Sequence, residues 1–443
     1  MSLSPSLYFL LSVALAAPKT SSVSTSTTSS TTTTITTTAS SSAAPIHSHP
    51  SSVYHGSYSG TPTTTGELRA TSVGTGVSVA SPGPAATTYP SDGKLHDAQP
   101  APYVPAGGVG LNKSPVYNVK SDFDYQSLAL GLYQEYIELD LFRYGLTEFS
   151  ASDFDAAGLS SVDRYLIEFM AEQEIGHATL LSNILGDEYA PSECAYNYPA
   201  FASVREYVDF CQKLTRWGES GVYGFLPHLE SREAAQLLLQ SISTEARQQL
   251  IFRQFEGLFP MPVWFEVGIP QSWAWTLLAP YVSSCPANQT RLVWQNFPAL
   301  NIINNPVPAY ANATPAITQN RSTPLSQPGG QVNLVWDAPG KPVGPNNSYI
   351  TSTSAGRPAY VAWVTQLNVT YSALTISNSS CNNGKNITYA STTQPNLETF
   401  SGDPAINGTI FIAVTDDDPF LTSYNLSLIN DHVVAGPAVY QAG

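Results

Sequence analysis

Hydrophobic residues recur every three or four positions through the middle of the chain, which is the spacing of one face of an α-helix. Four segments show it, each long enough for a helical bundle: 122–146, 161–186, 201–217 and 230–257. Gly186, Gly218 and Gly257 follow three of these segments, as C-terminal caps do. Ser160 and Asp163 predict a capping box at the start of the second segment. The pattern therefore predicts a four-helix bundle within residues 116–300.

The pattern changes twice after the last helical segment. An aromatic and proline-rich stretch follows residue 258, and we expect its tryptophans to seal the bundle: Trp264, Trp273, Trp275 and Trp294. Beyond residue 330, short alternating runs such as VNLVW (332–336) and TIFIAV (409–414) are separated by Gly, Pro and Asn. These runs are typical of antiparallel strands. We expect a mainly α protein with a small β-rich domain at 301–443.

The first residues have the composition of a secreted precursor. Residues 7–17 (LYFLLSVALAA) are apolar, too few to span a bilayer, and end in the Ala-x-Ala of a cleavage site, although no Lys or Arg precedes them. We predict a signal peptide at 1–17. Twenty of the 23 residues from Thr20 to Ser42 are Ser or Thr, which predicts a disordered, O-glycosylated stalk over 18–115. No later stretch is long and apolar enough to predict a transmembrane segment.

Sequons for N-glycosylation concentrate in the second half of the chain. None lies between residues 113 and 287, so the bundle is expected to be compact and the β-rich domain to be rich in exposed loops. The predicted glycosylation sites are Asn288, Asn312, Asn320, Asn346, Asn368, Asn378, Asn386, Asn407 and Asn425.

Charge excludes some classes of partner. The chain carries 18 basic and 33 acidic residues, a net charge of −15, and only 12% of its residues are charged. Nucleic acids and anionic membranes both need a basic surface, so neither is an expected partner. Residues 101–300 hold 23 of the acidic residues and 11 of the basic ones. Any functional carboxylates are therefore expected in the bundle.

Four cysteines are present, Cys194, Cys211, Cys285 and Cys381, and none has the spacing of a metal site. In an oxidising compartment we expect two disulfides, with three pairings open.

Several glutamates occupy positions where the helical pattern calls for hydrophobic residues. Glu135 lies on the apolar face of the first helix, with Glu138 one turn further on. Glu174 and His177 replace hydrophobic residues on the inner face of the second helix, and Glu245 does so in the fourth. Buried carboxylates are expected to be paired or to bind a metal.

Three helices thus direct glutamates at a common axis, and Glu174-x-x-His177 places an oxygen and a nitrogen ligand one turn apart. Bundles hold iron or manganese in this way, and carboxylates with imidazole suit a redox-active ion. The candidate ligands are Glu135, Glu138, Glu174, His177, Glu245 and Gln248. The expected cofactor is Fe or Mn, with a metal-free protein as the alternative.

These motifs resemble the ferritin-like family of secreted fungal proteins known as stress-response or sexual-development proteins. The segments that carry the resemblance are QEYIE (134–138), AEQEIGH (171–177), GVYGFLPH (221–228), EARQ (245–248), FRQFEGLFP (252–260), CP (285–286) and HVVAGP (432–437). The resemblance covers roughly two thirds of the chain and implies a ferritin-like four-helix bundle with metal ligands on the motif positions.

The sequence departs from the metal pattern of this family at two places. Gln248 stands where a second histidine is expected, and the helix predicted at 201–217 directs Thr215 rather than a carboxylate inward. Glu219 follows that predicted helix and is a possible substitute. The remaining residues suit one metal ion better than two.

Three functions remain compatible with these features, and the sequence leaves open whether the protein is an enzyme. The departures favour a non-catalytic secreted glycoprotein with a degenerate metal site, with cell-wall or extracellular partners. The alternative is an Fe- or Mn-binding bundle with oxidase or metal-handling activity. A carbohydrate-binding β-rich domain is supported only by aromatic residues and by secretion.

Overall fold

The computed structural model describes residues 92, 94–98, 106–108, 113–186, 188–287, 289–308, 315, 325–382, 385–399, 403 and 408–443. The predicted signal peptide and most of the predicted stalk lie outside these residues. Within the range predicted as stalk, β1 (Ala106–Gly108) pairs antiparallel with β2 (Lys113–Val116). The sequence pattern predicted no strand there, because neither segment alternates in polarity.

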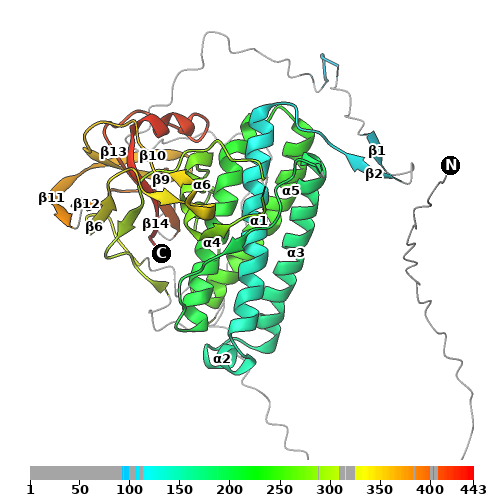
Figure 1. Cartoon of the computed structure of the whole chain (residues 1–443), viewed down its shortest axis with the longest axis horizontal. Helices are drawn as coiled ribbons and strands as arrows, with labels where there is room; N and C mark the ends of the chain where they lie inside the picture. The colour runs from blue at the N-terminus through cyan, green and yellow to red at the C-terminus, as the bar shows by residue number, and fades with distance from the viewer. Residues whose placement is uncertain are drawn as a thin grey trace, which may run out of the picture. The chain divides into compact units, whose positions relative to one another are not determined.

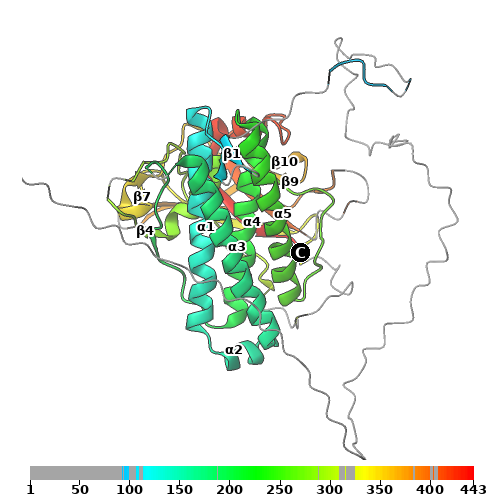
Figure 2. The same cartoon turned by 90° about the vertical axis from the view of Figure 1, so that its right-hand side faces the viewer.

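Four long helices run side by side (Figures 1 and 2). They are α1 (Asp122–Glu148), α3 (Ser161–Leu185), α4 (Val204–Phe225) and α5 (Arg232–Phe255). Helix α1 packs against α3 and α4, and α5 packs against α4 and α3. This is the predicted four-helix bundle. The shorter α2 (Ala151–Ala156) and α6 (Gln271–Leu278) were not predicted.

A serine side chain caps the N-terminus of each long helix. Each accepts a hydrogen bond from a backbone N–H of the first turn, which satisfies a donor that has no partner inside the helix. The four caps are Ser121, Ser160, Ser203 and Ser231. Ser160 forms the predicted capping box with Asp163.

The predicted end of the third long helix is wrong. Helix α4 continues through Gly218 to Phe225, whereas Gly186 and Gly257 follow their helices with positive φ angles, as caps do. At Gly218 an added Cβ would lie 2.6 Å from Gln134 Nε2 and 2.7 Å from Glu138 Oε1. Gly218 is therefore needed for the close approach of α4 to α1.

One disulfide joins Cys194 to Cys285 and links the ends of the ribbon formed by β3 (Ala195–Tyr196) and β4 (Val282–Ser284). Cys211 is a free thiol, buried on α4 inside the bundle core. The prediction of two disulfides, which assumed that every cysteine pairs, is therefore wrong for Cys211.

The tryptophans after the last long helix do not all seal the bundle. Trp273 and Trp275 on α6 are fully buried, as expected. Trp294 is half-buried and meets the ring of Phe123 edge to face. Trp264 is 56% exposed, so the prediction is wrong for this residue.

Two four-stranded antiparallel sheets form the β-rich part, as predicted. Their strand orders are β10-β9-β13-β14 and β11-β12-β6-β5. The strands are β5 (Leu300–Ile302), β6 (Gln331–Asp337), β9 (Tyr360–Thr365), β10 (Asn368–Ala373), β11 (Thr375–Asn382), β12 (Lys385–Thr393), β13 (Thr409–Thr415) and β14 (Val433–Gln441). A further ribbon pairs β7 (Pro342–Val343) with β8 (Tyr349–Ile350).

The inner strands β9 and β13 of the first sheet are buried on both faces, which explains why β13 has a continuous apolar sequence. Phe411 and Ala413 of β13 belong to the core that the helices share. Ile410 and Ile412 alternate with them and pack into the core between the two sheets. The strands lie on the α4 and α6 side of the bundle (Figure 1). In the described region, the bundle and the first sheet therefore share one hydrophobic core, and the two sheets enclose a second.

None of the described helices is long and apolar enough to cross a membrane.

Candidate metal centre

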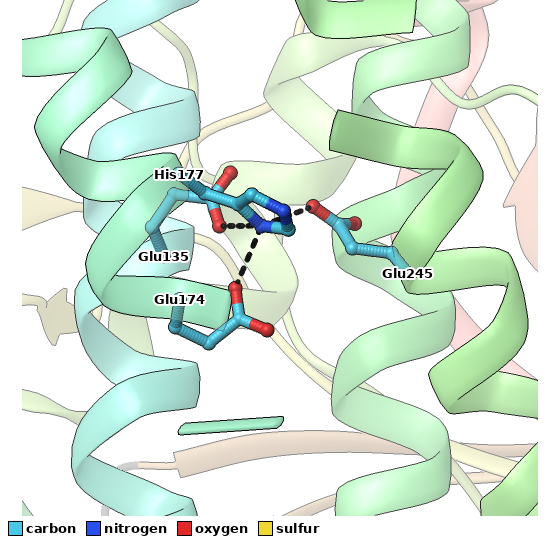
Figure 3. A group of neighbouring side chains, drawn as sticks. All are labelled: Glu135, Glu174, His177 and Glu245. Atoms are coloured by element: carbon cyan, nitrogen blue, oxygen red, sulfur yellow. Dashed lines mark hydrogen bonds and ion pairs between the residues drawn. The ribbon is translucent and has the colours of Figure 1, made fainter. Parts of the chain in front are cut away.

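Three helices bring four predicted ligands together in the bundle core (Figure 3). Glu135 comes from α1, Glu174 and His177 from α3, and Glu245 from α5. One ligand atom of each lies within 4.8 Å of those of the other three. The three glutamates are at most 2% exposed, and His177 is 9% exposed. The predicted convergence of these side chains is therefore confirmed.

The His177 ring turns Nδ1 toward the carboxylates. Nδ1 lies 3.0 Å from Glu174 Oε2, 3.2 Å from Glu135 Oε2 and 3.7 Å from Glu245 Oε1. The other ring nitrogen, Nε2, lies 2.9 Å from Thr244 Oγ1 on α5. Thr244 was not among the predicted site residues. The available signal was a hydroxyl directly before an inward-facing glutamate.

Gln248 lies at the edge of this group and contacts it through its nitrogen. Gln248 Nε2 donates to Glu174 Oε1 at 2.5 Å and to Gln173 Oε1 at 3.3 Å. Among the described residues, none donates to its buried Oε1. The structure thus places Gln248 beside the predicted ligands as a hydrogen-bond donor.

Glu138 is not part of the converging group, although it is 1% exposed. Its carboxyl group accepts a hydrogen bond from Gln134 Nε2 at 2.7 Å and one from Thr215 Oγ1 at 3.4 Å. Gln134 in turn accepts from Trp217 Nε1 at 3.2 Å. Glu138 therefore belongs to a hydrogen-bonded network between α1 and α4.

Glu219 does not supply the missing carboxylate. It lies inside α4, and its carboxylate is 3.1 Å from Arg216 Nη2. Arg216 also pairs with Glu266. Among the described residues, no carboxylate of α4 takes part in the converging group.

Without a metal ion, burial raises the pKa values of carboxyl groups in this core, so they keep their protons to higher pH. It raises the pKa of Glu135 to about 8, although the nearby His177 acts in the opposite direction. Burial and neighbouring carboxylates raise the pKa values of Glu138 and Glu245 well above the usual range. Burial alone would lower the pKa of His177, but Glu135 and Glu174 outweigh it and raise that pKa to about 12. A cation in this core would replace protons.

The residues present fit one metal ion. Three carboxylates and one imidazole form a donor set suited to Fe or Mn. In the described part of the chain, Glu245 Oε2 is buried and receives no hydrogen bond, so it lacks the partner that a buried carboxylate oxygen requires. A second ion does not fit, because Glu138 is engaged by Gln134 and Thr215, and Gln248 presents its N–H to Glu174.

A bundle of four long helices, three of which direct glutamates and a histidine into the core, is the architecture of a ferritin-like protein. Residues 121–258 match the family model of the ferritin-like domain. The chain is also 54% identical over 372 residues to Protein rds1 of Schizosaccharomyces pombe, a match that covers 80% of this chain and 90% of that protein. The chain therefore belongs to the fungal ferritin-like family that includes Protein rds1, as its motifs predicted.

The described sequon asparagines differ in exposure. Asn346 and Asn378 are exposed, whereas Asn368 and Asn425 are half-buried. Asn386 lies on β12. The predicted sites Asn288, Asn312, Asn320 and Asn407 lie outside the described residues.

Proposed function

We propose that this protein is a secreted ferritin-like protein that binds a single Fe or Mn ion in its bundle core. The ligands are Glu135, Glu174, His177 and Glu245. The proposal excludes two-metal oxidase chemistry, and it places the protein outside the cell, at its surface or in its wall. The observation that carries it is the convergence of the four ligand atoms within 4.8 Å of one another in a buried core.

Each residue has a defined part in this site. Glu135, Glu174 and Glu245 supply negative charge from three separate helices, so that the ion also ties the helices together. His177 supplies the nitrogen ligand, and Gln248 holds Glu174 through its amide N–H. When bound, Fe or Mn supplies one-electron redox chemistry. The low exposure of all four ligands limits the access of bulk water.

The extracellular location is supported by two features of the sequence. Residues 7–17 have the length and composition of a secretory signal, and the sequons gather outside the bundle. Asn346 and Asn378 are exposed, as glycan acceptors must be. Sequencing of the N-terminus of protein collected from the culture medium tests this part. Processing after Ala16 or Ala17 is expected, and retention of the full-length chain inside the cell would contradict it.

The metal content of the purified protein tests the binding proposal. The parent protein, reconstituted with Fe²⁺ or Mn²⁺ and then desalted, is expected to retain about one ion per chain, and Glu174→Ala is expected to retain less than about a tenth of that. Glu172→Ala is the matched control, because Glu172 is exposed on the same helix. Equal metal retention by Glu174→Ala and Glu172→Ala would contradict the proposal.

A non-catalytic scaffold without metal is the second candidate. The hydrogen bonds from Gln248 to Glu174 and between His177 and Thr244 favour it, because they hold the group together without an ion. In that case the function resides in extracellular contacts. Parent protein that retains no metal after reconstitution would support this candidate.

A further inference from the structure

Both nitrogens of the His177 ring have partners, and the partners come from different helices. Nδ1 faces Glu135 of α1, Glu174 of α3 and Glu245 of α5. Among the described residues, Nε2 contacts Thr244, at 2.9 Å from the hydroxyl oxygen. The ring is therefore fixed in orientation, with one nitrogen toward the ligand group and one toward a hydroxyl of α5.

The Thr244 hydroxyl has one proton, and a backbone carbonyl accepts it. Thr244 Oγ1 lies 2.7 Å from the carbonyl oxygen of Ser241, one turn earlier on α5. Since a hydroxyl donates a single hydrogen bond and accepts others, Oγ1 acts as the acceptor toward Nε2. Nε2 must then carry a proton. The only ring nitrogen that can lose its proton and offer a lone pair is Nδ1.

We propose that Thr244 is a positioning residue that fixes the tautomer of His177, so that Nδ1 and not Nε2 binds the metal ion. This inference rests on the proposed function, since it assigns the ligand atom of the same site. The relay runs from the Ser241 carbonyl through the Thr244 hydroxyl to Nε2–H. Thr244 also joins α5 to α3 at His177, which is the most exposed of the four ligands at 9%.

The second partner of a ligating histidine commonly sets its orientation and its strength as a ligand, and loss of that partner costs about 10- to 100-fold in metal affinity. Here the partner is a neutral hydroxyl and adds no charge to a core that already holds three glutamates. Thr244→Val keeps the shape of the side chain and removes the hydroxyl. We expect it to weaken metal binding about 10- to 100-fold.

Two further variants separate the hydrogen bond from other effects. Thr244→Ser retains the hydroxyl and should restore affinity to within about 3-fold of the parent, well inside the range expected for loss of the partner. Thr179→Val makes the same substitution on α3, at an exposed residue. Among the described residues, the Thr179 hydroxyl bonds the carbonyl of Ile175 alone, at 2.7 Å. This control should bind metal as the parent does.

The test uses Co²⁺ for affinity and Zn²⁺ for the ring tautomer, each added to the metal-free full-length protein. Competition titrations give the Kd for Co²⁺. Nitrogen-15 NMR of the Zn²⁺-loaded protein reports which ring nitrogen of His177 keeps its proton. The parent and Thr244→Ser should show a proton on Nε2 that exchanges slowly with solvent. Thr244→Val should lose this slow exchange as well as affinity.

The outcomes distinguish this inference from the proposed function. If the parent binds neither Co²⁺ nor Zn²⁺, the proposed function fails and this inference fails with it. If the parent binds metal through Nε2, or if Thr244→Val binds Co²⁺ as tightly as Thr179→Val does, only the role of Thr244 is overturned. Circular dichroism of each metal-free variant checks that the helices are intact. If Thr244→Val unfolds, the ring nitrogen that keeps its proton in the Zn²⁺-loaded parent still tests the inference.

Discussion

Gly218→Ala should destabilise the protein, although the same change usually stabilises a helix interior. Alanine is favoured over glycine there by about 1 kcal/mol. At this position, however, the new Cβ would lie 2.6 Å from Gln134 Nε2, 2.7 Å from Gln134 Cγ and 2.7 Å from Glu138 Oε1. Both side chains are buried and bonded to each other at 2.7 Å, so the new methyl group must displace the stem of Gln134 together with this hydrogen bond.

The magnitude follows from the contacts that Gln134 makes. Its Nε2 also donates to the carbonyl of Leu214 at 3.2 Å, and its Oε1 accepts from Trp217. Overpacking costs about 1–3 kcal/mol, and a buried polar group left unsatisfied costs about 1–3 kcal/mol. After subtraction of the helix preference, we expect Gly218→Ala to lower the free energy of unfolding by about 1–5 kcal/mol.

Gly176→Ala is the matched control. Gly176 lies within α3 on its exposed side, and its added Cβ would meet nothing within 4 Å. This variant should gain about 0.5–1 kcal/mol. Urea unfolding of the metal-free proteins, followed by circular dichroism, measures both changes. A stabilised Gly218→Ala protein, comparable to Gly176→Ala, would refute the close packing of α4 against α1.

Three further predictions concern other parts of the molecule. Burial raises the pKa of Glu219 from 4.5 to about 8, so the folded state binds the proton more tightly and this residue's contribution to stability is lost as pH rises from 4.5 to about 8. Glu219→Gln should flatten that part of the stability profile, and an unchanged profile of melting temperature against pH would contradict it. The Cys194–Cys285 disulfide closes a loop of 91 residues. On the chain-entropy account, replacement of both cysteines by alanine should lower the free energy of unfolding by about 4–5 kcal/mol. Urea unfolding measures this change, and a loss below about 1 kcal/mol would contradict that account. Asn346→Gln and Asn378→Gln should each remove one glycan from the secreted protein, as seen by mass spectrometry, and unchanged masses would show that these exposed sequons are not used.

The positions of the ligands could be predicted because they break a periodic pattern. Glu135, Glu174, His177 and Glu245 interrupt apolar faces on three helices, and a helix in a bundle turns its apolar face toward the core. The helices were predictable for the same reason, since most of their inner positions are aliphatic or aromatic. The runs at 332–336 and 409–414 likewise identified the antiparallel strands β6 and β13.

The wrong and missed predictions concern small residues, whose roles depend on tertiary contacts that the sequence pattern does not show. A glycine after a helical run indicates a cap, but Gly218 serves the contact with Gln134 and Glu138, which depends on tertiary packing. Cys211 was expected to pair because the number of cysteines is even, yet its position inside α4 isolates it. Thr244 was not predicted, because a hydroxyl before an inward-facing glutamate acquires its role only beside a ring from another helix.

The stoichiometry of metal binding tests the central claim most directly. Anaerobic titration of the metal-free protein with Fe²⁺, repeated with Mn²⁺, measures the number of ions bound per chain. The donor set of Glu135, Glu174, His177 and Glu245 predicts saturation at one ion per chain. Saturation at two ions, or no binding by a correctly folded protein, would contradict a single-ion site in the bundle core.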